Sequence, residues 1–386
     1  MGVMRAEPHR FADMTTRTVG AVWRAYDLQL TTYAALLGAI GIVMAYTNSV
    51  EAGVSVLSVG TVFTRSLMWS GVAIVAFVAA TAFDYRWFRT LSWPVYGANL
   101  FLLVLTLAIG DGVGGSARWI NVGPFTFQLS ELAKILMIAV LATYLSEKRR
   151  RLDSLRSILG ACLLMAPPVL LVLRQPDLGT SLVLAAILAG MLFMSGASLK
   201  WLLAMAGGVV VAIPLAWTYV LIDYQQKRIL SFLNPTADTQ GAGWQVLQSQ
   251  IAIGAGGLTG VGLTNGSQSR GNFLPVQESD FVFAVLAQEL GFIGALVVFL
   301  LFAALIWRVL ACAWRSQDPF GTLFGAGLAT MLLIQVFVNV GMVIGILPVT
   351  GIPLPFITHG GASLVSIAIG LGVVQSVNIR QRRAEW

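Results

Sequence analysis

The sequence alternates long apolar runs with short polar segments, and this alternation predicts a bundle of membrane-spanning helices. A helix needs about 20 residues to cross the hydrocarbon core of a bilayer. Ten runs approach that length, and we expect spans at 29–47, 67–83, 93–110, 129–146, 157–173, 179–196, 201–222, 281–307, 320–347 and 361–379. The pattern therefore predicts an all-α, polytopic integral membrane protein, built as a single domain over residues 1–386.

One segment interrupts this alternation. Residues 223–280 form a long polar stretch between two apolar runs, and we expect a large extracytoplasmic loop there. Loops of this length are usually functional or disordered, and the apolar side chains within this one argue against simple disorder. Its glycine-rich part, residues 253–275, has no GK[ST] ending and is not a phosphate loop. Those glycines indicate either a flexible hinge or a backbone that lies close against a substrate.

Composition agrees with a membrane protein and narrows the function. Apolar residues make up 57% of the chain and charged residues 11%, whereas about a quarter of a soluble domain is charged. The two cysteines, Cys162 and Cys312, fall in or beside apolar runs and predict no disulfide framework. The net charge of +7 comes mostly from short loops between spans, so we expect no nucleic-acid partner.

The basic residues also predict how the chain is oriented. Of the 24 Lys and Arg residues, 17 lie in the alternate segments that include both termini, 6 lie in the opposite set and Lys134 lies inside a span. Cytoplasmic loops carry the excess of positive charge. We therefore expect a multi-pass protein of the bacterial cytoplasmic membrane with both termini, including residues 1–28, in the cytoplasm. The segments expected outside are 111–127, 174–178, 223–279 and 348–360.

Two charges fall inside an apolar run near its outer end. Glu131 and Lys134 are three residues apart, so they share a helix face and can pair. Charged residues within spans are rare and are functional candidates by default. The pair indicates either an ion pair that ties two helices together or the polar lining of an outward-facing cavity.

The other outer loops carry further candidates. Arg118 beside Trp119 indicates either an interfacial anchor or a guanidinium that binds a phosphate. Asp177 indicates either a turn or helix cap or a residue of the site. The segment Pro348–Phe356 contains too many prolines for a continuous helix and suits a re-entrant or lid segment. We interpret His359, which follows it, as a structural residue rather than a ligand.

Asp280 stands where the large loop meets the next apolar run. One interpretation is a helix cap, which would stabilise the helix by about 1 kcal/mol. The other is a general base at the membrane surface. A helix N-terminus favours the carboxylate, whereas apolar surroundings favour the protonated acid, so the two effects on its pKa oppose each other.

Five stretches carry a resemblance to a known family. They are GGSARWINVGPFTFQLSELAKILMIAVLA, RQPDLGTS, FLNPTADTQGAGWQVLQSQIAIGAGGLTGVGL, FLPVQESDFVFAVLAQELGFIG and PVTGIPLPFITHGGAS. In this order they resemble the motifs of the SEDS family (shape, elongation, division and sporulation) of peptidoglycan glycosyltransferases. NGSQSRGNFLP, at residues 265–275, is more similar to the RodA-like elongation branch than to the FtsW-like division branch.

The resemblance implies a function: polymerisation of lipid II into glycan strands at the outer face of the membrane, in elongation and cell shape. It implies that Asp280 is the essential acidic residue, and that Glu131 and Lys134 form the polar pair of a central cavity. Arg118, Trp119 and Asp177 would line the outer site. Besides lipid II and membrane lipids, the implied partner is a class B penicillin-binding protein.

This reaction requires a base and cationic groups. A sugar 4-hydroxyl attacks an anomeric carbon that carries a lipid diphosphate, so a base is needed and Asp280 is the candidate. Cations are needed near the leaving diphosphate, and the candidates are Arg118, Lys134, Lys227 and Arg228. A divalent cation, Mg²⁺ or Mn²⁺, between Asp280 and the diphosphate is the expected cofactor, although no ligand cluster identifies it. No organic cofactor is expected.

The sequence departs from the family at two places. Thr358-His359 stands where the family commonly has Ser-Tyr, and Glu278-Ser279 stands where it commonly has His-Thr. Glu278 would add a carboxylate that raises the pKa of Asp280 or helps to hold a cation.

Two functions of other classes compete with polymerisation. A flippase for the lipid-linked precursor would need polar groups at both faces, and a non-catalytic scaffold would not need Asp280. The polar candidates crowd the outer face, which favours an enzyme there.

Overall fold

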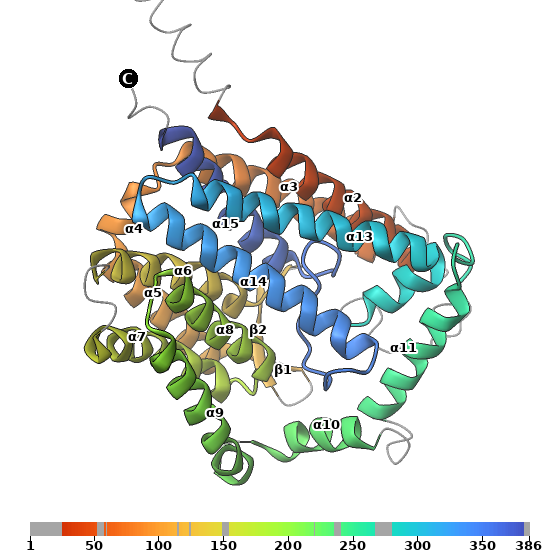
Figure 1. The fold of residues 1–386 in the computed structure, drawn as a ribbon. Coiled ribbons are helices and arrows are strands. Elements are labelled where there is room, and N and C mark those ends of the chain that lie inside the picture. Colours follow the sequence, from red (N-terminus) through yellow and green to blue (C-terminus); the bar gives the residue numbers. More distant parts are fainter. Residues whose placement is uncertain are drawn as a thin grey trace, which may run out of the picture.

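The computed structural model describes residues 25–51, 58, 60–113, 116–122, 125–148, 154–219, 221–234, 241–266 and 280–381. Ten long helices account for most of them (Figure 1). They are α2 (Leu28–Glu51), α3 (Val62–Ala82), α5 (Ser92–Ile109), α6 (Leu129–Lys148), α7 (Leu155–Arg174), α8 (Leu178–Met194), α9 (Leu199–Tyr219), α13 (Val282–Trp314), α14 (Pro319–Val343) and α15 (Gly361–Gln381). Each of the ten expected spans is present; nine are long and apolar enough to cross a membrane, and α8 is an apolar helix of 17 residues.

Short elements lie in the connections. The helices are α4 (Arg86–Thr90), α10 (Asp223–Leu233) and α11 (Ala242–Gly256). The strands β1 (Asp111–Val113), β2 (Ser116–Val122) and β3 (Phe125–Phe127) form an antiparallel sheet in the order β1-β2-β3. The pattern of apolar runs predicted only loops at these places, because strands of three to seven residues and helices of 5 to 15 residues leave no long apolar signal.

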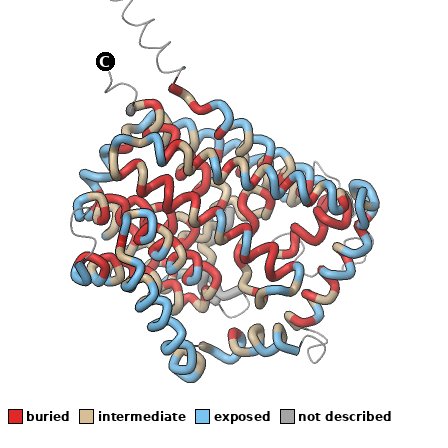
Figure 2. The backbone as a smooth tube through the Cα atoms, in the orientation of Figure 1, coloured by how far each residue is buried: buried red, intermediate tan, exposed pale blue. Residues whose placement is uncertain are grey.

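The core is built around α6, α14 and α15. Figure 2 shows buried backbone through the centre of the bundle, whereas α9 is mostly exposed and contains no buried residue. Small residues let the central helices approach closely. A Cβ on Gly327 of α14 would lie 2.9 Å from the Cγ2 atom of Ile138 in α6 and 2.8 Å from the Sδ atom of Met191 in α8. The centre of the bundle therefore depends on a glycine at that crossing.

The loops sort to two ends of the bundle as the alternation predicts. Both ends of the described chain meet, because the Asn378 Nδ2 atom donates to the Ala25 carbonyl at 2.8 Å. At the opposite end, the Arg228 Nη1 atom donates to the Val349 carbonyl at 3.2 Å. The expected outer loops thus share one end of the molecule, and the side of the membrane that this end faces stays a prediction.

The longest helix, α13, is broken at Gly291, where φ is 69° and ψ is −170°. The glycine-rich residues 257–262 lie against this break. Four backbone hydrogen bonds join them: Val261 N to Gln288 O, Gly262 N to Glu289 O, Phe292 N to Gly257 O and Ile293 N to Leu258 O, all between 2.9 and 3.1 Å. A Cβ on Gly260 would lie 2.1 Å from the Glu289 carbonyl oxygen. In the described part of the glycine-rich residues 253–275, the backbone therefore lies close against the protein's own helix α13.

Candidate functional site

The segment between α14 and α15, residues 344–360, organises one end of the molecule. It contains no helix, as its prolines predict. Its apolar side chains are nevertheless buried: Val349, Ile352, Leu354 and Ile357 are each 4% exposed or less. Irregular backbone is tolerated in a membrane protein where protein covers it or where it lines a cavity. Several of the candidate site residues lie along this segment.

Asp280 and Arg228 meet at Gly351 of this segment. A Cβ on Gly351 would lie 3.5 Å from the Asp280 Oδ2 atom and 3.6 Å from the Arg228 Nη1 atom. The φ of Gly351 is 74°, a backbone conformation that strongly favours glycine. The sequence predicted both side chains as site residues, and the structure places a carboxylate and a guanidinium on the same glycine.

Arg228 is held in place from two sides. Besides the hydrogen bond to Val349, its guanidinium carbon lies 4.5 Å from the centroid of the Tyr224 ring, one turn earlier in α10. A cation over an aromatic face is stabilised by the ring's negative face. The side chain is half-buried, so its charge is both fixed and accessible.

Asn339 of α14 aligns the two segments that meet at Asp280. Its Nδ2 atom donates to the carbonyl of Asp280 at 3.1 Å and to the carbonyl of Ile352 at 2.8 Å. The side chain is fully buried. Asn339 was not among the residues predicted from the sequence, although an amide inside an apolar run is itself a signal. Asn339 fixes the start of α13 relative to residues 351–352.

Asp280 lies next to the start of α13. Helix α13 begins at Val282, and its N-cap position is Phe281, whose side chain makes no capping hydrogen bond. Asp280 lies one residue outside that cap and is half-buried. Its carboxylate lies beside Gly351, and both interpretations of Asp280, helix cap and general base, stay predictions.

Asp177, by contrast, does cap a helix. Its Oδ1 atom accepts from the Thr180 backbone N–H at 3.0 Å, and its Oδ2 atom accepts from the Thr180 hydroxyl at 2.9 Å and from Gln128 Nε2 at 3.1 Å. Both carboxylate oxygens are thus bonded within the chain. Two residues later, a Cβ on Gly179 would lie 2.9 Å from the Thr350 carbonyl oxygen. The cap therefore positions α8 against the segment that carries Gly351.

Glu131 and Lys134 form the predicted pair. The Lys134 Nζ atom donates to Glu131 Oε1 at 2.7 Å, and the two residues are 1% and 2% exposed respectively. The pair lies within α6 alone, and across the described chain neither side chain makes a second hydrogen bond or ion pair. It does not tie two helices together, and a role in lining a cavity stays a prediction.

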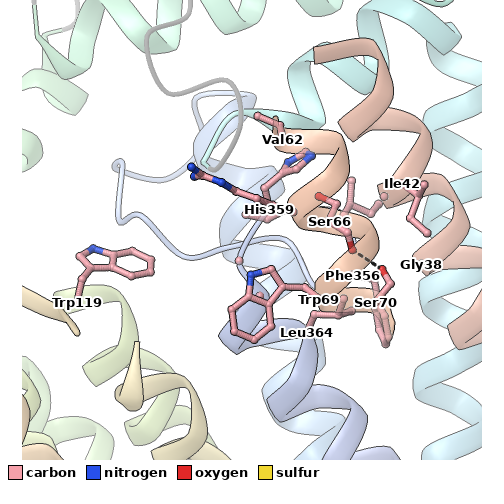
Figure 3. A pocket seen from close by; sticks show the side chains of 16 residues that line it. Gly38, Ile42, Val62, Ser66, Trp69, Ser70, Trp119, Phe356, His359 and Leu364 are labelled. Atoms are coloured by element: carbon pink, nitrogen blue, oxygen red, sulfur yellow. Dashed lines mark hydrogen bonds between the residues drawn. The ribbon is translucent and has the colours of Figure 1, made fainter. Parts of the chain in front are cut away.

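A cavity of about 140 Å³ lies at the same end, between α2, α3 and residues 356–361. Figure 3 shows Trp119 of β2 on one side and Trp69 and His359 on the other. Arg65 of α3 also lines it. The Trp69 indole packs where Gly361 has no side chain, since a Cβ there would lie 2.1 Å from the ring. Trp119 is therefore a lining residue, but of a cavity separate from the contacts around Gly351.

Of the three remaining predicted site residues, only Lys227 has a side chain in the described part of the structure. Lys227 is exposed on α10, and none of the described contacts joins it to Asp280 or Arg228. The backbone of Arg118 lies in β2, while the side chain is outside the described part of the structure. Glu278 lies outside the described residues altogether.

The described residues contain no cluster of three or more His, Cys, Asp and Glu side chains that could hold a metal ion. Asp280 offers one carboxylate, and the Arg228 cation lies beside the same glycine. This donor set is too small to hold a divalent ion without oxygen atoms from a substrate. The arrangement can accept a proton at Asp280 and bind an anion at Arg228.

The fold and these contacts define a class: a polytopic membrane protein that gathers a carboxylate, a guanidinium and a buried ion pair at one end. The family model for FtsW, RodA and SpoVE, described as a cell cycle protein, matches residues 27–383. The chain belongs to this SEDS family.

Individual relatives agree with this membership. The chain is 38% identical to stage V sporulation protein E of Bacillus subtilis over 365 residues, which is 91% of this chain and 96% of the relative. It is 42% identical to peptidoglycan glycosyltransferase MrdB of Escherichia coli over 290 residues, or 75% and 78% of the two chains.

A solved structure is similar throughout. It is a chain of a peptidoglycan synthase complex that coordinates polymerization and crosslinking. That chain is 31% identical, has a TM-score of 0.78, and the match covers 92% of this chain and 98% of the other. The resemblance read from the five motifs is confirmed, and so is the helical membrane fold. Because the relatives come from several branches, the RodA-like assignment stays a prediction.

Proposed function

We propose that this protein polymerises lipid II into glycan strands with Asp280 as the general base. As a SEDS family member the chain is a peptidoglycan glycosyltransferase, and its relatives carry that name. The observation that supports the assignment of the base is the meeting of Asp280 and Arg228 at Gly351, at the end of the bundle that gathers the polar residues.

The proposed step has one base and one departing anion. The 4-hydroxyl oxygen of one sugar attacks the anomeric carbon of another, and a new glycosidic bond forms. The bond from that carbon to the diphosphate oxygen breaks, and the diphosphate leaves with the electron pair. The hydroxyl proton passes to the Asp280 carboxylate, which must therefore be ionised at the start.

Other residues bind and orient in this proposal. Arg228 attracts the leaving diphosphate, since a guanidinium forms two parallel hydrogen bonds with phosphate oxygens. Lys134 has N–H donors beyond the one given to Glu131 and can meet a second polar group in the interior. Trp119 offers an aromatic face to a sugar at the neighbouring cavity. A bridging Mg²⁺ or Mn²⁺ stays a prediction, and no step above passes through one.

The proposal extends to the biological setting. The similarity of residues 265–275 to the RodA-like branch supports a role in elongation, in which case depletion would give round cells rather than filaments. A class B penicillin-binding protein is the proposed partner, because a similar chain belongs to a synthase complex. Failure of any such transpeptidase to co-purify from native membranes would contradict it.

The decisive variant is Asp280→Asn. Asparagine keeps the size of the side chain but cannot accept the proton, so polymer formation should fall about 10²–10⁴-fold. Lipid II binding and the melting temperature in detergent should stay close to those of the unchanged protein. Polymer would be measured by gel analysis of products from purified protein and lipid II.

Asp223→Asn is the matched control. Asp223 is an exposed carboxylate at the start of α10, at the same end of the molecule. It lies outside the contacts at Gly351, and its loss should leave polymerisation unchanged. Polymerisation near the normal rate by Asp280→Asn would remove Asp280 as the base. Full loss of activity in both variants would point to a general effect of charge at this end instead.

A further inference from the structure

An apolar groove opens on the flank of the bundle, far from the contacts around Gly351. Its volume is about 450 Å³. It lies where α3, α4 and α5 diverge, with α15 beneath, and it is lined by Ala76, Ala79, Ala80, Phe83, Trp87, Phe88, Leu91, Val95 and Ile369. The lining contains no charged or hydrogen-bonding side chain except the Trp87 indole. The groove therefore suits a hydrocarbon chain.

The groove begins at a membrane surface. Helix α4 connects α3 to α5 at the end where both ends of the described chain meet (Figure 1). The Ser376 hydroxyl donates to the Phe83 carbonyl at 2.6 Å, which ties α15 to this corner. From Phe83 to Ala76 is seven residues, or about 10 Å along a helix axis. The groove thus runs from the surface into the depth of one leaflet.

Two guanidinium groups lie on the short helix at this corner. Arg86 and Arg89 are exposed on α4, in the same helix as the lining residues Trp87 and Phe88. Arg86 interacts with the Tyr85 hydroxyl and has the carboxylates of Asp84 and Asp318 nearby. The Asp84 Oδ2 atom also lies 3.7 Å from the Nε atom of Arg380. Three guanidinium groups thus accompany two carboxylates, so this corner keeps a net positive charge.

We propose that this groove binds an acidic phospholipid, with its phosphate at Arg86 and Arg89 and one acyl chain between α3 and α5. Charge complementarity selects an anionic headgroup, because each basic residue near a surface attracts anionic lipid. Trp87 and Trp93 are 54% and 68% exposed, as expected of aromatic residues at the headgroup level.

The size of the groove argues against a protein occupant. A helix is about 10 Å wide and rises about 5.4 Å per turn, so about 450 Å³ would hold only about one turn. An acyl chain is narrower and can follow the groove. The site is separate from the proposed polymerase centre, which lies at the other end of the bundle, and does not depend on that proposal.

Native mass spectrometry of the whole purified protein would test the site. The probes are dioleoyl phosphatidylglycerol and dioleoyl phosphatidylcholine, whose acyl chains are the same. We expect phosphatidylglycerol to bind preferentially. Arg86→Gln/Arg89→Gln should weaken its binding about 30-fold, at about one factor of five for each basic residue. Arg156→Gln/Lys200→Gln removes the same charge from exposed positions at the same end and should change binding little.

A second variant examines the groove itself. Ala79 is exposed on α3, so the larger side chain of Ala79→Trp fills the groove without entering the core. This variant should bind phosphatidylglycerol more weakly. The melting temperature of the lipid-free protein should stay unchanged. Equal binding of the two lipids would overturn the proposal, as would an equal loss in the control variant. Stronger binding of undecaprenyl phosphate than of phosphatidylglycerol would also overturn it, since the occupant would then be a polyprenyl lipid.

Discussion

Two ion pairs, each with a buried carboxylate, lie at opposite ends of this molecule, and they are built differently. Asp27, just before α2, receives both Nε and Nη2 of Arg308 at 2.7 to 2.9 Å, the Leu30 backbone N–H at 3.0 Å and the Cys312 thiol at 3.3 Å. Glu131 receives one donor, Lys134, from its own helix. The Asp27 carboxylate thus accepts hydrogen bonds from two parts of the chain, whereas the Glu131 carboxylate accepts one from its own helix.

From this difference we predict that one ion pair holds the fold and that the other takes part in binding. Burial alone would raise the pKa of Asp27, but the hydrogen bonds from Arg308 and the Leu30 N–H outweigh it and hold that pKa below its ordinary value. Asp27 therefore fastens the start of α2 to α13. A buried pair gains stability only when further hydrogen bonds satisfy both partners. The Glu131–Lys134 pair lacks these, which is consistent with a role in binding.

The largest effect should come from the Glu131–Lys134 pair, whose carboxylate has a single donor. Glu131→Ala leaves the Lys134 charge buried without its partner and should destabilise the protein by about 3–5 kcal/mol. Glu131→Gln keeps a hydrogen-bond acceptor and should fold better, while polymer formation falls about 10- to 100-fold. Melting temperature and polymer yield would be measured on the same preparations. If both variants and a Glu131→Gln/Lys134→Gln double variant match the unchanged protein in both measurements, the pair has no role in binding.

The Asp27–Arg308 pair should show the reverse pattern, in which stability falls and activity does not. Asp27→Asn loses charged hydrogen bonds worth about 1.5–3 kcal/mol, and the lower end is expected because the Arg308 side chain is 21% exposed and can reach water. Polymer formation per folded molecule should not change. Asp84→Asn is the control, since the Asp84–Arg380 contact is long and exposed and should contribute about 0–1 kcal/mol. A loss of activity at full stability in Asp27→Asn would erase the distinction between the two pairs.

A smaller effect should appear in the pH dependence. Because the pKa of Asp27 is lowered from its ordinary value of 3.8, its contribution is present above that value and is lost as the pH falls through the folded pKa. The difference in melting temperature between the unchanged protein and Asp27→Asn should stay constant from about pH 7 to about pH 5 and shrink below about pH 4. A difference that shrinks well above pH 5 would show that this carboxyl is not stabilised in its charged form.

Sequence alone predicted the spans but not their neighbours. Helices α6 and α9 are both apolar enough to cross a membrane, yet α6 lies in the core and α9 contains no buried residue. Span prediction succeeds because the bilayer selects on composition along a single helix. Which helix becomes central depends on complementary surfaces elsewhere in the chain, such as the crossing at Gly327, and no local pattern records this.

In the candidate site, too, some contacts were predictable from the sequence and others were not. The Glu131–Lys134 contact was predictable because a spacing of three is a local geometric fact, and the cap at Asp177 is equally local. The meeting of Arg228 and Asp280 at Gly351 joins three distant parts of the chain, so the sequence could name the side chains but not their common neighbour. Asn339 was missed because its role is to bond two backbone carbonyls that only the fold brings together.

The break in α13 also bears on how the protein is made. Residues 257–262 are translated before Gly291, so the segment that completes the break already exists when α13 enters the bilayer. An unsatisfied backbone group in hydrocarbon costs several kcal/mol, and four hydrogen bonds close this one. Residues 257–262 are thus available as hydrogen-bond partners before α13 is made. In a rearranged chain with residues 257–262 after α13, the helix would be inserted while the backbone groups at its break lack these partners.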